Sequence, residues 1–345
     1  MNNCNAEPHS TGRISYIDFL KVIGLTGIII AHVNPHSWAM LLRSFDVPLM
    51  VILSSILANR SFAKYSETRS SAFDYYVSRI KRLVIPTWIF LIFNFLLSFI
   101  ITGQRESIKY YAASFLLTRY GIGYVWIILI YLYSAMLIPA FARLKLSVKG
   151  SIIVSASYIL YEIAYYYRLG LNDSGLINKF LDTTFYYIIP YGLLTYLGYN
   201  YFKMKNRTKL IIALASFIVF FTLAAYYRSA LGSFQLLHIA KYPPRVYYLS
   251  YGIGCSFALL ILCEKNNLKV YANKVIRFIS SHSMWIYLWH ILVLAVYGKF
   301  NLPETWFIKL IVVYLLSILI VFCVNQVLDY MERNHHFSFS KYLRG

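Results

Sequence analysis

Residues 16–34 read YIDFLKVIGLTGIIIAHVN, an apolar run with few ionisable side chains. About 20 mostly apolar residues in helical conformation cross the hydrocarbon core of a bilayer, so this run predicts a membrane-spanning helix. The flank before it is polar, Lys21 lies inside it, and no small-residue cleavage site follows it. These features differ from those of a cleaved secretion signal, and we therefore expect an uncleaved span.

Similar apolar runs recur along the chain. They cover residues 45–58, 83–101, 124–142, 151–167, 183–202, 210–227, 246–263, 283–297 and 305–328. The sequence therefore predicts an all-α, polytopic membrane protein with about ten transmembrane helices. We expect one membrane domain over residues 16–328, flanked by cytoplasmic segments at residues 1–15 and 329–345.

The composition excludes the ordinary soluble classes. Of the 345 residues, 59% are hydrophobic and 13% are charged, whereas a soluble domain averages about 25% charged residues. The net charge of +20 would suggest nucleic acid as the partner of a soluble protein. In a membrane protein it indicates Lys and Arg retained in cytoplasmic loops, so we expect no nucleic acid partner. The basic predicted loops 59–82 and 203–209 lie on the side of the N-terminus, and alternation then predicts that both termini are cytoplasmic.

The first predicted span also contains candidates for chemistry. Lys21 and His32 are eleven positions apart, which is about three helical turns and about 16 Å along one face. Asp18 lies one turn before Lys21, close enough to pair with it. An ionisable residue inside a membrane is a functional hypothesis by default. The alternatives are a snorkelling Lys21 and a His32 that bonds to a neighbouring helix.

Several motifs resemble one family, and they follow in the family's order. Lys21, ten further residues and His32 resemble the Arg/Lys-x10-His signature of membrane acyltransferases of type three, which are integral-membrane O-acyltransferases of bacterial surface glycans. Further resemblances are found in VPLMVILSS at 47–55, RIKR at 79–82, YVW at 124–126 and SMWIYLWH at 283–290. Residues 182–187 and 191–192 resemble the subgroup of the enterobacterial common antigen O-acetyltransferase. Lys21 replaces the commoner Arg, and Ser55 replaces a Gly at which helices approach closely.

The resemblance implies an O-acetyltransferase in the bacterial inner membrane. Acetyl-CoA, reached from the cytoplasm, would be the co-substrate, and a sugar hydroxyl of a cell-envelope polysaccharide or its lipid-linked precursor would be the acceptor. Because a sugar hydroxyl is a poor nucleophile near neutral pH, a base is needed, and His32 is the candidate. Lys21, Arg79 and Arg82 are the candidates for binding the CoA phosphates.

Five more residues complete the predicted site. Asp18 pairs with Lys21, Ser54 and His290 are candidate oxyanion donors together with Asn34, and Trp126 stacks on a substrate ring. The alternatives are a structural hydrogen bond for His290 and a place in the interfacial aromatic belt for Trp126. Glu162, inside a predicted span, marks a polar cavity or pairs with an Arg or Tyr. His36 lies at the outer end of the first span, either in a solvated loop or where the acceptor arrives.

Other functions stay open from the residues alone. An acetyl-histidine intermediate is the alternative to direct transfer. A multispan carrier of lipid-linked sugars, or a non-catalytic relative, would share this composition, although a carrier would show internal repeats and midplane charges in both halves. The four cysteines are scattered, so we predict no metal site, and we expect no permanently bound cofactor. Membrane lipids are the remaining expected partner, and the sequence does not indicate an oligomeric state.

Overall fold

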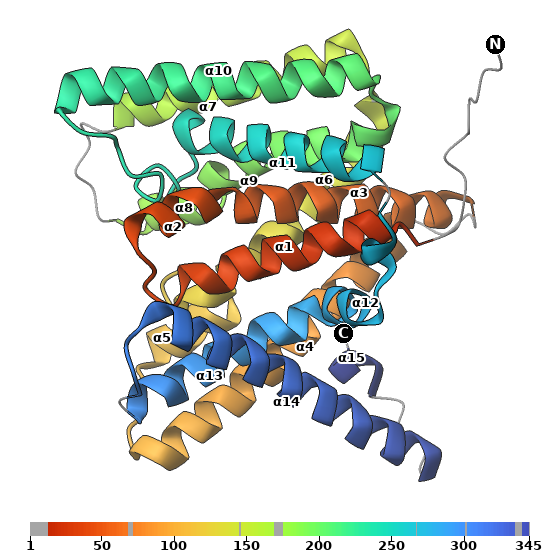
Figure 1. Ribbon diagram of the computed structural model, residues 1–345, viewed down its shortest axis with the longest axis vertical. Coiled ribbons are helices and arrows are strands. Elements are labelled where there is room, and N and C mark those ends of the chain that lie inside the picture. The colour runs from red at the N-terminus through yellow and green to blue at the C-terminus, as the bar shows by residue number, and fades with distance from the viewer. Residues whose placement is uncertain are drawn as a thin grey trace.

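The structure is a computed structural model that describes residues 13–67, 72–144, 146–168, 175–266, 268–300, 302–334 and 340–344. Within these residues it consists of helices and connecting segments and contains no β-strand (Figure 1). The predicted all-α class is therefore confirmed. Residues 1–12 of the predicted N-terminal segment, and residues 335–339 and 345 of the predicted C-terminal segment, lie outside the described residues.

Among the described residues, ten helices are at least 16 residues long, and each overlaps one predicted span. They are α1 (Ser15–Ala31), α3 (Asp46–Glu67), α4 (Ala72–Thr102), α6 (Trp126–Leu144), α7 (Val148–Arg168), α9 (Phe185–Asn200), α10 (Asn206–Leu231), α11 (Val246–Asn266), α13 (Ser283–Lys299) and α14 (Trp306–Asn334). The shorter helices are α2 (Ser37–Leu42), α5 (Ile108–Phe115), α8 (Leu176–Thr183), α12 (Lys274–Ser281) and α15 (Ser340–Arg344).

Six helical stretches in the described residues are long and apolar enough to cross a membrane. A seventh is obtained if α12 and α13, which are bent by 74° at their junction, count as one span. With 17 and 16 residues, α1 and α9 are shorter than a typical span. The structure thus supports a multi-pass membrane protein, whereas the count of about ten spans and the location of the termini stay predictions.

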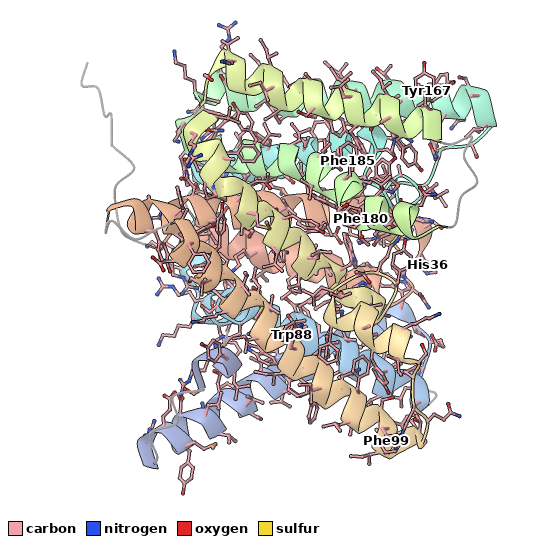
Figure 2. The ribbon with its side chains drawn as sticks, turned by 180° about the vertical axis from the view of Figure 1, so that it is seen from behind. His36, Trp88, Phe99, Tyr167, Phe180 and Phe185 are labelled. Atoms are coloured by element: carbon pink, nitrogen blue, oxygen red, sulfur yellow. The ribbon has the colours of Figure 1, made fainter. Side chains whose placement is uncertain are left out.

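The long helices pack around α1 and α3, which lie side by side in the middle of the bundle (Figure 1). On one side α9 and α11 pack against α3, and α7 and α10 form an outer layer; on the other side α4, α13 and α14 cross at an angle. His36, Phe99, Tyr167 and Phe180 lie at the same end of the bundle (Figure 2). We call this the His36 end, and the opposite end is the one at which α1 begins.

Glycines allow α3 to lie in the centre. A Cβ atom on Gly24 of α1 would lie 2.6 Å from Cγ of Met50, and one on Gly198 of α9 would lie 2.5 Å from the carbonyl oxygen of Ile52. Neither neighbour on α3 has room for it. The Cβ atom of Ser55 also lies only 2.9 Å from this position on Gly198. The close helix approach that a glycine at position 55 would allow is therefore still made, because the glycine is on α9 instead.

Candidate active site

The first turns of α1 are held by the C-terminal end of α12. The hydroxyl of Ser280 donates to Oδ1 of Asp18 at 2.6 Å, and the ammonium of Lys21 donates to the Ser280 carbonyl oxygen at 2.6 Å. Asp18 also forms an ion pair with Arg13. The expected direct pairing of Asp18 with Lys21 is therefore not found among the described residues, where Ser280 bonds to both side chains instead. The free carbonyls at the end of α12 attract cations.

A pocket opens beside this contact, between α1, α3, α4, α6 and the junction of α12 with α13. We call it the basic pocket. It is lined by Lys21, Ser54, Arg79 and Arg82, by hydroxyl-bearing residues that include Tyr131 and Tyr287, and by apolar residues that include Leu25, Ile28, Leu53 and Ile127. The empty space, counted with its open mouth, is about 1160 Å³. Four of the predicted binding residues thus meet at one cavity.

The two arginines of the basic pocket have no carboxylate partner among the described residues. The guanidinium of Arg79 lies 5.2 Å from the centre of the Tyr75 ring, and Arg82 forms no ion pair with any described residue. Two such groups one turn apart on α4 are suited to binding an anion with several charged oxygens. The motif RIKR thus contributes two of the cations that line the basic pocket.

Two histidines form a pair further along α1. His32 follows the last residue of α1, and its Nδ1 lies 2.9 Å from Nε2 of the fully buried His290 on α13. The two rings are stacked, with centres 5.1 Å apart. Nδ1 of His290 bonds to the carbonyl oxygen of Tyr287, and the Tyr124 ring meets the His32 ring edge-on at 4.7 Å. We call His32 and His290 the histidine pair.

The hydrogen bonds of the histidine pair determine where its protons lie. The Tyr287 carbonyl oxygen can only accept, so Nδ1 of His290 must donate. In a neutral His290 the other nitrogen, Nε2, is then an acceptor, and Nδ1 of His32 must donate to it. Nε2 of a neutral His32 consequently has a free lone pair. The arrangement thus presents His32 as a base with a defined basic atom.

The basic pocket and the histidine pair are joined along one face of α1. Lys21, Leu25 and Ile28 line the pocket and follow one another at helical spacing, and His32 is the next residue on that face. Tyr287 joins the same two regions from α13. It lines the pocket, its carbonyl oxygen bonds to His290, and its hydroxyl donates to the carbonyl oxygen of Tyr124. His32 and His290 themselves do not line the pocket.

The remaining candidates lie nearer the His36 end. Trp126 is 8% exposed and packs against Tyr187 and Tyr242, with ring centres 5.7 and 5.2 Å away. It is therefore buried among aromatic rings rather than set in an exposed belt. Glu162 pairs with Arg245 at 2.6 Å and accepts from the Tyr158 hydroxyl, so pairing explains it without a polar cavity. His36 is exposed, with its ring facing that of Trp306.

Sequence reasoning missed three contributors to this region. Tyr287 is within a quoted motif and one turn before His290, a spacing that signals contact. Ser280 gave no signal, because its role depends on how α12 packs. Lys241 lies in the basic and aromatic segment 241–245, between α10 and α11; it is buried, and burial lowers its pKa to about 8, against an opposing effect of Asp46.

Metal binding has no geometric support in the described part of the chain, where no group of three or more His, Cys, Asp or Glu side chains is arranged to hold an ion. The absence of a metal and of a resident cofactor stays a prediction.

Comparison with known proteins agrees with the motifs. A family model described as an acyltransferase domain matches residues 14–328. No significant match to a curated protein or to a solved structure was found. The finer resemblance to the subgroup of the enterobacterial common antigen enzyme stays a prediction.

Proposed function

This chain belongs to acyltransferase family 3, and we propose that it transfers an acetyl group from acetyl-CoA to a sugar hydroxyl of a cell-envelope polysaccharide or its lipid-linked precursor. We further propose that it acts in a bacterial inner membrane, with the end of the bundle at which α1 begins facing the cytoplasm. The observation that carries the proposal is the single face of α1, which begins in a pocket whose two arginines have no carboxylate partner among the described residues and ends at a histidine with a free basic nitrogen.

The basic pocket suits the donor. Arg79 and Arg82 are available for the phosphates of CoA, and Lys21 adds a third positive charge at the same level. The apolar walls beyond them, which include Leu25 and Ile28, suit the uncharged pantetheine arm. An arm of that kind would span the distance of about 16 Å between Lys21 and His32. The thioester would then reach the histidine pair from the pocket.

The reaction follows from the protons assigned above. Nε2 of His32 accepts the hydroxyl proton while the hydroxyl oxygen attacks the thioester carbonyl carbon. The tetrahedral intermediate collapses with cleavage of the C–S bond, and the departing CoA sulfur takes the proton from His32. The products are an acetyl ester and free CoA. His290 is a positioning residue in this scheme, because its hydrogen bond to Nδ1 keeps Nε2 of His32 unprotonated.

The roles of Ser54 and Trp126 are proposed on position. Ser54 lines the basic pocket and remains the candidate donor to the thioester oxygen. Trp126 packs against other aromatic rings, two residues after Tyr124, whose ring meets that of His32, so an acceptor that reaches His32 would pass close to it. Aromatic faces of this kind suit the apolar face of a sugar ring.

The test is a transfer assay on the purified protein in liposomes. Acetyl-CoA labelled in its acetyl group is incubated with envelope glycan, and we expect label on the glycan in an ester that mild alkali removes. The variant His32→Ala, with the same expression and thermal stability, is the control. Movement of lipid-linked sugar without acetyl transfer would instead identify a carrier. Binding of acetyl-CoA with neither activity would identify a non-catalytic relative.

A further inference from the structure

Lys241 differs from the other buried cations of the described chain. Four Lys or Arg residues are buried there, and three have carboxylate partners: Arg43 with Asp46 at 2.5 Å, Lys209 with Glu264 at 2.8 Å, and Lys309 with Glu304 at 3.4 Å. Lys241 is 7% exposed, and its ammonium group forms no hydrogen bond or ion pair with any described residue. An unpaired charge at such a depth is costly, and buried charges are normally paired.

The surroundings of Lys241 are aromatic. Its ammonium nitrogen lies 5.6 Å from the centre of the Trp126 ring and 5.4 Å from that of the Tyr242 ring. The Trp126 ring in turn packs against Tyr187, whose buried hydroxyl has no hydrogen-bond partner among the described residues. Ring faces attract a cation, yet they offer no acceptor for its N–H groups. Donors are thus gathered here without an acceptor.

The carboxylate of Asp46 does not supply an acceptor. Asp46 acts on Lys241 through its charge, but its two oxygens are taken by the Arg43 guanidinium and by the backbone N–H of Val47 at 2.6 Å. Arg43 repels Lys241. Tyr124, two residues before Trp126, meets the His32 ring edge-on at 4.7 Å, so the Lys241 ammonium group and the proposed base both contact the short segment 124–126. A negatively charged group bound beside His32 would supply the acceptor that the Lys241 ammonium group lacks.

We propose that Lys241 is the anion-binding residue of the acceptor site, and that the acceptor has a carboxylate or phosphate group close to the hydroxyl that is acetylated. This inference rests on the proposed function, because it requires that an acceptor reach His32. The shared chemistry is an anionic sugar, whose charge comes either from an acidic sugar unit or from the phosphate that links a sugar to a lipid. Trp126 then faces the sugar ring, and Tyr187 adds a hydroxyl donor.

The test uses three water-soluble probes that share one sugar ring: methyl glucuronide, glucose 1-phosphate and neutral methyl glucoside. Equilibrium binding to the purified protein in nanodiscs is measured without acetyl-CoA, so that it does not depend on transfer. We expect the wild type to bind at least one anionic probe about 10- to 150-fold more tightly than the neutral probe, the range for a hydrogen bond to a charged group. Carboxylate and phosphate probes then identify the source of the charge.

Variants assign the preference to one residue. Lys241→Met should remove the preference for the anionic probe and leave acetyl-CoA affinity unchanged, whereas Lys241→Arg should retain it. Lys109→Met, which removes an exposed positive charge from α5, is the matched control and should behave as wild type. If Lys241→Met does not fold, loss of the preference in Lys241→Gln, with retention in Lys241→Arg, supports the proposal equally.

Two outcomes overturn the inference: no preference for either anionic probe in the wild type, or an unchanged preference in a folded Lys241→Met variant. Failure of the proposed function looks different. In that case Lys241-dependent binding of an anionic probe would be found, but no acetyl group would reach any acceptor.

Discussion

The charged groups of the basic pocket differ from those near the His36 end. Near the His36 end, Arg43 pairs with Asp46 at 2.5 Å and Arg245 pairs with Glu162 at 2.6 Å. In the pocket, Arg79 and Arg82 face a cavity and have no carboxylate partner among the described residues. A cation that stabilises the fold pairs with a carboxylate of the chain, whereas a cation that binds a ligand has no such partner and can contact the ligand. By this criterion Lys241 belongs with the pocket arginines.

The comparison requires that the two regions face opposite sides of the membrane. In a background without the four native cysteines, a reagent that cannot cross the membrane should label His238→Cys in intact cells and spare Lys81→Cys. Both positions are exposed at the protein surface, so access alone decides the result, and the difference should be all or none. Labelling of position 81 with protection of 238 would invert the orientation and remove the argument for cytoplasmic acetyl-CoA.

His32 is the point at which the two regions meet. Replacement by Ala should lower the transfer rate by about 10²- to 10⁴-fold, the usual contribution of a general base. Affinity for acetyl-CoA should stay near that of the wild type, because the base acts only when the acceptor is present. Transfer above about a tenth of the wild-type rate would contradict the assignment. Loss of acetyl-CoA binding would instead make His32 a ligand contact.

Asp46 tests the structural half of the comparison. Asp46→Ala leaves the buried Arg43 without its partner, which should lower the free energy of unfolding by about 3–5 kcal/mol. The double variant Arg43→Met/Asp46→Leu should recover most of that loss. Chemical denaturation in detergent measures both. Full stability in Asp46→Ala would show that this pair is not structural.

Arg79 and Arg82 test the ligand half. Either change to Ala should weaken acetyl-CoA binding by about 10- to 150-fold at fixed salt, with little effect on stability. Lys81 is exposed on the same turn but does not line the basic pocket. The variant Lys81→Ala should therefore bind acetyl-CoA with normal affinity.

Lys21 is expected to resemble these arginines, and Lys21→Arg should be tolerated. Lys21→Ala also removes the bond to Ser280, so its stability must be measured beside its affinity. If both arginine variants kept their affinity for acetyl-CoA, the motif RIKR at 79–82 would serve only to keep this segment in the cytoplasm.

His290 should give the smallest effect on transfer. His290→Phe removes the acceptor for Nδ1 of His32 and should lower the rate about 10- to 100-fold, the range for groups that orient a histidine. His290→Gln offers an amide oxygen in its place and should restore part of the rate. In the Phe variant the pH profile of transfer should change, whereas the KM for acetyl-CoA should stay the same. A uniform loss in both variants, in step with lost stability, would make His290 merely structural.

The sequence by itself determined what depends on neighbours along the chain. Hydropathy identified the segments that became the ten long helices, because an apolar run is local. The shared face of Lys21 and His32 follows from helical spacing, and so does the one-turn separation of Arg79 and Arg82. The ordered set of short motifs, from Lys21 and His32 to residues 283–290, was sufficient to indicate a family whose model matches residues 14–328.

Only the tertiary structure decided which distant groups meet. Spacing predicted that Asp18 would pair with Lys21, but the packing of α12 brought Ser280 between them from 262 positions away. The bond from His32 to His290 joins residues 258 positions apart. The burial of Lys241 without a hydrogen-bond or ion-pair partner in the described part of the chain likewise depends on how its loop packs against Trp126. Helical periodicity gives each residue a face, whereas contacts between faces depend on how the helices pack.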